Sequence, residues 1–83
     1  MKWFGRRHTV RLYGKPGCHL CEDARSVLDR LQQRYRFEIE EVDITSDPAL
    51  FRRYDILIPV IVIDGVREME APISERDLRR ALR

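Results

Sequence analysis

The chain lacks most of the features that mark secreted and membrane proteins. Its 83 residues include only two cysteines, four glycines, four prolines and one tryptophan. Two cysteines are too few for the multi-bridge framework of a small secreted domain. No stretch approaches the ~20 apolar residues of a membrane-spanning helix, and the N-terminal segment lacks the apolar run and cleavage site of a secretory signal. We therefore expect a cytoplasmic protein with no membrane association.

The chain also has little excess of either positive or negative charge. Sixteen Lys and Arg residues and 14 Asp and Glu residues give a formal net charge of +2. The arginines are spread along the chain, apart from Arg6-Arg7 and the C-terminal turn, so the dense basic stripe of a nucleic-acid-binding protein is missing. We expect no nucleic-acid partner. A chain of this length has room for one core, which predicts a single domain. We also expect a monomer.

The sequence does contain a regular succession of strand and helix patterns, without repeats or low-complexity linkers. Residues 1–8 have little pattern and are interpreted as an irregular leader, and residues 9–83 as one domain. Within this domain, apolar periodicity predicts strand 9–13, helix 20–35, strand 36–44, a helix from residue 48, strands 59–63 and 66–70, and a helix after residue 74.

Local signals sharpen this prediction. Asp47 is suited to cap a helix that has Pro48 at its first position, and Ser74 is suited to cap the last helix. Asp64-Gly65 is a strong hairpin signal, so strands 59–63 and 66–70 should be antiparallel. The first strand–helix–strand unit should be parallel with a right-handed crossover. Together these elements predict an α/β fold with a four-stranded mixed sheet flanked by three helices.

Both cysteines lie in the stretch GKPGCHLC, between the first strand and the first helix. A bridge between Cys18 and Cys21 closes too small a loop to constrain the unfolded chain much, so redox chemistry or metal binding is the expected use. A helix N-terminus favours the thiolate through its unpaired N–H groups and partial positive charge. We expect Cys18 to attack a substrate disulfide and Cys21 to resolve the mixed disulfide.

Nearby charges act on these thiols in both directions. Lys15 adds positive charge, whereas Glu22 and Asp23 oppose ionisation unless they point into solvent. We therefore expect a modestly lowered pKa for Cys18. For His19 two roles are given equal weight: a second cation beside the thiols when it is protonated, or an exposed loop residue.

Pro59 begins the continuously apolar run that ends at Ile63. Proline is tolerated at the first position of a strand, and an Ile-Pro bond costs only ~0.5–1 kcal/mol to hold cis. A cis bond here would bring the backbone of Ile58 against the cysteine loop, where its main-chain groups can pair with an extended substrate. The alternative is that Pro59 only starts an edge strand.

The stretches LYGKPGCHLCEDA, EVDI and LIPVIVIDG resemble the glutaredoxin-like branch of the thioredoxin superfamily, and the motif is similar to that of its small Cys-His-Leu-Cys members. The resemblance implies a thioredoxin-like fold (βαβαββα) and thiol–disulfide oxidoreductase activity in electron transport and cell redox homeostasis, with no tightly bound cofactor. It implies that Cys18 and Cys21 are the nucleophilic and resolving thiols. It also implies that Pro59 is the family's cis-proline, that the backbone of Ile58 meets substrate, and that Lys15 occupies a position where many glutaredoxins contact the glutathione carboxylate.

Two departures from true glutaredoxins bear on glutathione. Leu20 stands where their motif usually has an aromatic residue, and residues 70–74 (EAPIS) lack the glycine pair that permits close approach of a small peptide. Glutathione is therefore one candidate reductant and thioredoxin reductase is another. The expected substrates are disulfide-bearing proteins or small thiol compounds.

Two other classes of function stay open. A metal-binding module, for zinc or an iron–sulfur cluster, would use Cys18 and Cys21 with His19 or His8, although structural zinc normally takes four protein ligands. A redox-inert adaptor would keep the fold without the chemistry.

Four aromatic residues are given ordinary roles. Tyr13 and Tyr54 are expected to have a packing role rather than to border the cysteine loop. Trp3 and Phe4, in the leader, are expected to pack loosely on the domain or to contact a partner.

Overall fold

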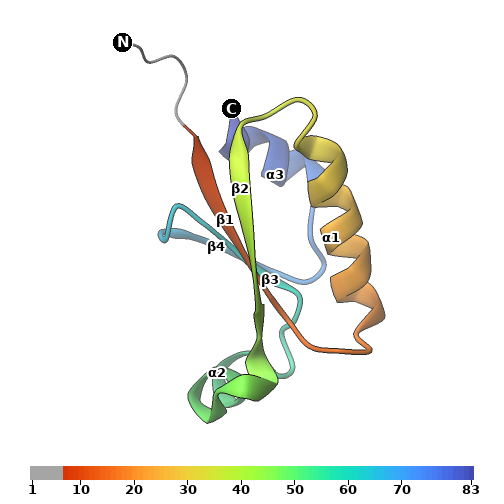
Figure 1. Ribbon diagram of the computed structural model, residues 1–83, viewed down its shortest axis with the longest axis vertical. Coiled ribbons are helices and arrows are strands. Elements are labelled where there is room, and N and C mark those ends of the chain that lie inside the picture. Colours follow the sequence, from red (N-terminus) through yellow and green to blue (C-terminus); the bar gives the residue numbers. More distant parts are fainter. Residues whose placement is uncertain (1–6) are drawn as a thin grey trace.

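The computed structural model describes residues 7–83, so the leader residues Trp3 and Phe4 lie outside the described part of the chain. Its elements, in order, are β1 (His8–Gly14), α1 (His19–Leu31), β2 (Phe37–Asp43), the 3₁₀ helix η1 (Ile44–Ser46), α2 (Pro48–Tyr54), β3 (Val60–Ile63), β4 (Arg67–Glu70) and α3 (Glu75–Leu82). This order confirms the predicted α/β fold (Figure 1). None of the helices in residues 7–83 combines the length and apolar character needed to cross a membrane.

The four strands form one mixed sheet in the order β2-β1-β3-β4. β1 is parallel to β2, β3 is antiparallel to β1, and β4 is antiparallel to β3, as the sequence patterns predict. Leu12 of β1, for example, lies opposite Glu41 of β2 and Ile61 of β3. Because β3 has a neighbour on each side, Pro59 precedes an interior strand, and the edge-strand alternative is wrong.

The sheet separates two apolar clusters, because successive side chains of a strand point to opposite faces. Leu12 faces the larger cluster, to which α1 contributes Leu28 and α3 contributes Leu78. Tyr13, the next residue, faces the smaller cluster, which includes Tyr54 of α2. The centroids of the two tyrosine rings lie 4.6 Å apart, which confirms their packing role. α1 and α3 therefore cover one face of the sheet and α2 covers part of the other (Figure 1).

The start of β1 corrects the predicted boundary of the leader. The sequence pattern places His8 in the leader, but His8 is the first residue of β1, and its backbone N–H donates to the Arg36 carbonyl at 2.9 Å. Its imidazole Nδ1 also lies 2.6 Å from Oδ2 of Asp64, in the β3–β4 turn. Both partners are remote in sequence, so local pattern does not reveal them.

The capping predictions agree with the structure. The Asp47 carboxylate accepts a hydrogen bond from the Ala49 N–H at 2.8 Å, and Pro48 occupies the first position of α2. The Ser74 hydroxyl accepts from the Asp77 N–H at 3.2 Å at the start of α3. Each cap satisfies a backbone donor that has no partner within its helix.

Other element ends differ from the prediction by one to four residues. α1 ends at Leu31 rather than at residue 35, because the following residues form tighter turns. The hairpin turn includes Val66, which is exposed, so β4 begins at Arg67. Asp64 and Gly65 have φ values of 55° and 73°, as a type I′ turn requires.

Candidate functional site

A short loop carries the chain from the end of β1 into α1 and places Cys18 at the helix N-terminus. Gly17 adopts a φ of 79°, a backbone conformation that glycine tolerates. The Cys18 N–H donates to the Lys15 carbonyl at 3.2 Å, which closes the turn. Cys18 itself has extended backbone angles and is the N-cap residue of α1, and its carbonyl accepts from the Glu22 N–H at 3.1 Å.

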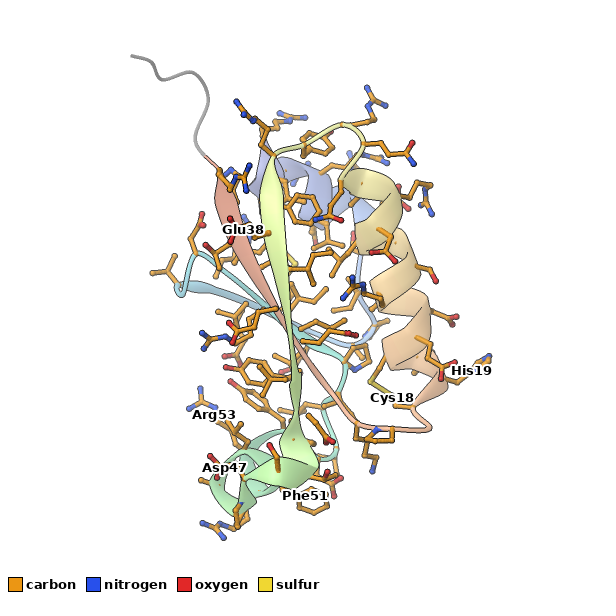
Figure 2. All side chains as sticks on the ribbon, viewed as in Figure 1. Cys18, His19, Glu38, Asp47, Phe51 and Arg53 are labelled. Atoms are coloured by element: carbon orange, nitrogen blue, oxygen red, sulfur yellow. A yellow bond between two sulfur atoms is a disulfide. The ribbon has the colours of Figure 1, made fainter. Side chains whose placement is uncertain are left out.

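The two cysteines form a disulfide, with Cα atoms 5.2 Å apart. The Sγ of Cys18 accepts a hydrogen bond from the Cys21 N–H at 3.2 Å, so the sulfur takes the place of the usual capping oxygen. Cys18 is half-buried, whereas Cys21 is buried with 8% of its surface exposed. Figure 2 shows Cys18 at the first turn of α1. Cys18 is therefore the more accessible of the two cysteines.

Gly14 packs directly against the second cysteine. A Cβ added at Gly14 would lie 3.0 Å from the Sγ of Cys21 and 3.1 Å from its Cβ. The backbone of Gly14 is extended, so the requirement for glycine is one of space and not of conformation. Gly14 opens the loop GKPGCHLC, and no local pattern in the sequence indicates its contact with Cys21.

The cations predicted beside the thiols are turned elsewhere. The Nζ of Lys15 lies 3.3 Å from Oδ1 of Asp55 and 5.9 Å from the centre of the Phe51 ring. His19 is the first residue of α1, has 87% of its side chain exposed and points away from the protein (Figure 2). Its partner is Glu22, at 3.9 Å. The structure therefore supports the exposed interpretation of His19.

A groove lies beside the cysteine pair and is named here the apolar groove. It encloses about 510 Å³ between three separate segments of the chain. Its walls are Leu20, Asp23, Ala24 and Val27 of α1, Ile56, Ile58 and Pro59 before β3, and Ala71, Pro72, Ile73 and Glu75 around the start of α3. Apart from Asp23 and Glu75, every lining residue is apolar.

Ile58 and Pro59 lie at the wall of the apolar groove and are joined by a cis peptide bond, as the family resemblance implies. The Ile58 N–H donates to the Tyr54 carbonyl at 3.1 Å, so this donor is already used within the protein. In residues 7–83 no hydrogen bond to the Ile58 carbonyl is found, so this acceptor has no partner within the described part of the chain.

A second cavity, of about 380 Å³, is lined by the cysteine loop, the first turns of α1 and the end of β2. Cys21 forms part of its wall together with charged residues of both signs, including Lys15, Arg25 and Asp43. Hydrogen bonds from the Thr45 hydroxyl and backbone N–H hold the pKa of Asp43 below its usual value. Since β2 and β3 flank β1 on opposite sides, the two cavities lie on opposite sides of the cysteine pair.

The predicted substrate residues are therefore divided between the two cavities. Ile58 and Pro59 line the apolar groove, and Lys15 lines the second cavity with its ammonium on Asp55. The structure does not bring Lys15 together with the cis-proline in one cavity. Sequence reasoning also missed Ile56, whose side chain is 92% exposed at the rim of the groove.

The described residues contain no group of three or more His, Cys, Asp or Glu side chains placed to hold a metal ion. His8 lies at the opposite end of β1 from the cysteines, and a seven-residue strand spans about 20 Å. His8 therefore cannot share an ion with Cys18 and Cys21 within one chain, and its place in the metal-binding alternative was wrong.

Comparison with known proteins agrees with this geometry. The sequence matches the family described as Glutaredoxin-like domain (DUF836) over residues 9–83. Protein Ne2328 from Nitrosomonas europaea is 27% identical, with a TM-score of 0.85 and coverage of 100% of each chain. Protein XcR50 from X. campestris is 31% identical, with a TM-score of 0.70 over 86% of this chain and 91% of its own. A thioredoxin mutant from Halobacterium salinarum, 20% identical with a TM-score of 0.71 over 90% of this chain and 71% of its own, shares the fold.

Proposed function

The chain belongs to the family of glutaredoxin-like domains, and from this premise we propose that it is a dithiol–disulfide oxidoreductase acting through Cys18 and Cys21. The observation that carries the proposal is the placement of the two sulfurs. They are close enough to bridge, one is accessible at a helix N-cap, and the other is buried directly behind it.

The reaction begins with the reduced protein. The Cys18 thiolate attacks one sulfur of a substrate disulfide, and the other substrate sulfur leaves as a thiolate that takes up a proton. The Cys21 thiolate then attacks the Cys18 sulfur of this mixed disulfide and displaces the remaining substrate thiolate, which is protonated in turn. The substrate has gained two electrons and two protons, and the protein is left with the Cys18–Cys21 disulfide.

The backbone of α1 favours the attacking form of Cys18. The Cys21 N–H, 3.2 Å from the Cys18 sulfur, stabilises a negative charge there, and the helix dipole acts in the same direction. Glu22 and Asp23 oppose this effect, but both are exposed, so solvent weakens their influence. The expected result is a modestly lowered pKa for Cys18 in the reduced protein.

The other parts of the proposal follow from this chemistry. No resident cofactor is needed, because the sulfur pair supplies both electrons. An outside thiol reductant, such as glutathione, or a reductase restores the dithiol. We place the activity in the cytoplasm, where thiols are kept reduced, and assign it to the monomer, with a disulfide-bearing protein or a small disulfide as substrate.

A reductase assay tests the proposal. Purified protein is given a small mixed disulfide with either glutathione or thioredoxin reductase as electron donor, and thiol release is followed. We expect turnover with at least one donor, none from Cys18→Ser, and a trapped mixed disulfide on Cys18 in Cys21→Ser, detected by mass spectrometry. If the wild-type protein turns over with neither donor and Cys21→Ser traps no substrate, the chain is a redox-inert adaptor.

A further inference from the structure

Large apolar side chains are exposed along the rim of the apolar groove. Leu20, between the two cysteines, is 59% exposed, and Ile56, across the groove, is 92% exposed. Each stands at the edge of a concave surface whose floor is also apolar. Exposed apolar groups that continue into an apolar groove are typical of a surface that is covered by a partner.

The charges of the groove are acidic. Asp23 and Glu75 are its charged lining residues, and no Lys or Arg side chain lines it. Glu75 is shared by two arginines, with Arg30 Nη2 at 2.5 Å and Arg79 Nη1 at 2.9 Å. Asp23 has no ion-pair or hydrogen-bond partner among residues 7–83. Of the two carboxylates that line the groove, the one nearer the cysteines in the chain is therefore the one left without a cation.

From this geometry we propose that the apolar groove binds an extended polypeptide segment with apolar side chains and a basic residue, so that protein disulfides are preferred to glutathione mixed disulfides. This inference rests on the proposed oxidoreductase function and identifies its substrate class. The apolar side chains cover Leu20 and Ile56, the substrate backbone donates to the Ile58 carbonyl, and the basic residue pairs with Asp23.

Glutathione fits this surface poorly. At neutral pH it carries two carboxylates and one ammonium group, and a carboxylate loses hydration in an apolar groove without gaining a cation there. Lys15, the cation that the family resemblance offers, is held by Asp55 at 3.3 Å and lines the other cavity. A peptide segment in the middle of a chain has no terminal carboxylates and avoids this cost.

The position of Asp23 predicts where the basic residue lies. Asp23 follows Cys18 by five residues, about 7.5 Å along the helix axis. In an extended chain two residues span a similar length, about 7 Å. The preferred basic residue is therefore two positions from the substrate cysteine.

Single-turnover kinetics with matched substrates test this inference without an electron donor. Two peptides have the same apolar residues around a single cysteine. One carries Lys, and the other Glu, at the positions two residues before and two residues after that cysteine. Each peptide, and glutathione, is joined by a disulfide to pyridine-2-thiol, whose release reports attack by Cys18. We expect the reduced protein to react about tenfold faster with the Lys peptide than with the Glu peptide, and more slowly with glutathione than with the Lys peptide.

Two pairs of variants assign the preference to the groove. Asp23→Asn should bring the Lys:Glu rate ratio close to one, whereas Asp29→Asn, a control on the same helix outside both cavities, should leave it unchanged. The ratio is the readout because an altered thiol pKa scales both rates alike. Ile56→Ser should slow both peptides about fivefold without slowing glutathione, and Val66→Ser, 86% exposed in the β3–β4 turn, should slow neither.

The outcomes separate the two proposals. The substrate inference is wrong, and the oxidoreductase proposal stands, if all three compounds release pyridine-2-thiol but the two peptides react at equal rates. The same conclusion follows if the glutathione compound reacts fastest. The same holds if Asp23→Asn leaves the ratio at its wild-type value. If none of the three compounds releases pyridine-2-thiol when it is mixed with the reduced protein, the oxidoreductase proposal fails and the substrate inference fails with it.

Discussion

Replacing Gly14 by alanine is expected to make the Cys18–Cys21 disulfide easier to reduce. The added Cβ would lie 3.0 Å from the Sγ of Cys21, closer than an ordinary van der Waals contact. The extended backbone of Gly14 accepts alanine, so the effect is steric. In the oxidised protein the bond to Cys18 holds the Cys21 sulfur in place, whereas in the dithiol the sulfur is free to turn away.

The size of the effect follows from this asymmetry. Overpacking of a well-packed site costs about 1–3 kcal/mol. If about 1.4 kcal/mol of this cost falls on the oxidised form alone, the reduction potential of the two-electron couple rises by about 30 mV. Because the added Cβ would also lie 3.1 Å from the Cβ of Cys21, which does not move when the sulfur turns, the dithiol form should be destabilised too, but less than the oxidised form.

Equilibration in buffers of defined thiol–disulfide ratio, followed by trapping of free thiols, measures the potential. Gly65→Ala is a suitable control. A Cβ at this position meets nothing within 4 Å, but the φ of +73° is strained for an alanine. That strain destabilises both redox forms equally and should leave the potential unchanged. A Gly14→Ala potential equal to that of the wild type, or below it, would refute the steric reasoning.

Three further predictions concern ionisation and stability. Alkylation of reduced Cys18 should reach half its maximal rate below the pH of ~8.5 that is typical of a free cysteine; a midpoint at or above that value contradicts stabilisation by the helix N-terminus. Burial, and secondly the charge of Glu68, raise the pKa of Tyr54, so its contribution to stability is fully present below pH ~10 and is lost as the pH rises through the raised value. Between pH 8 and 11, urea denaturation should therefore show a smaller loss of stability in Tyr54→Phe than in the wild type, and an equal loss would contradict the assignment. Ser74→Ala should lower the free energy of unfolding by about 1 kcal/mol through loss of the α3 cap, whereas Ser26→Ala, at an exposed position within α1, should be neutral or slightly stabilising; equal effects of the two changes would argue against the cap.

Features that depend on a single turn of chain were predictable from sequence. The caps Asp47 and Ser74 act on N–H groups two or three residues away, and the Asp64-Gly65 turn is closed by its immediate neighbours. The place of Cys18 at the start of α1 follows in the same way, because the helical pattern begins just after it. The arrangement of the four strands then follows from the order of these elements and the handedness of their connections.

Element ends were less predictable, because distant partners decide them. His8 joins β1 through the carbonyl of Arg36 and the side chain of Asp64, which lie 28 and 56 residues further along the chain. Its own neighbours in sequence contain no sign of either contact.

The sequence alone determined that a cysteine pair would begin a helix after a buried strand, because these properties depend on side chains a few residues apart. The tertiary structure decided what surrounds that pair. It placed Gly14 against Cys21, turned Lys15 toward Asp55, and built the apolar groove from three segments that only the folded sheet brings together. The shape and the charge of the surface around the sulfurs arise from packing between residues far apart in the chain, so local sequence patterns do not predict either property.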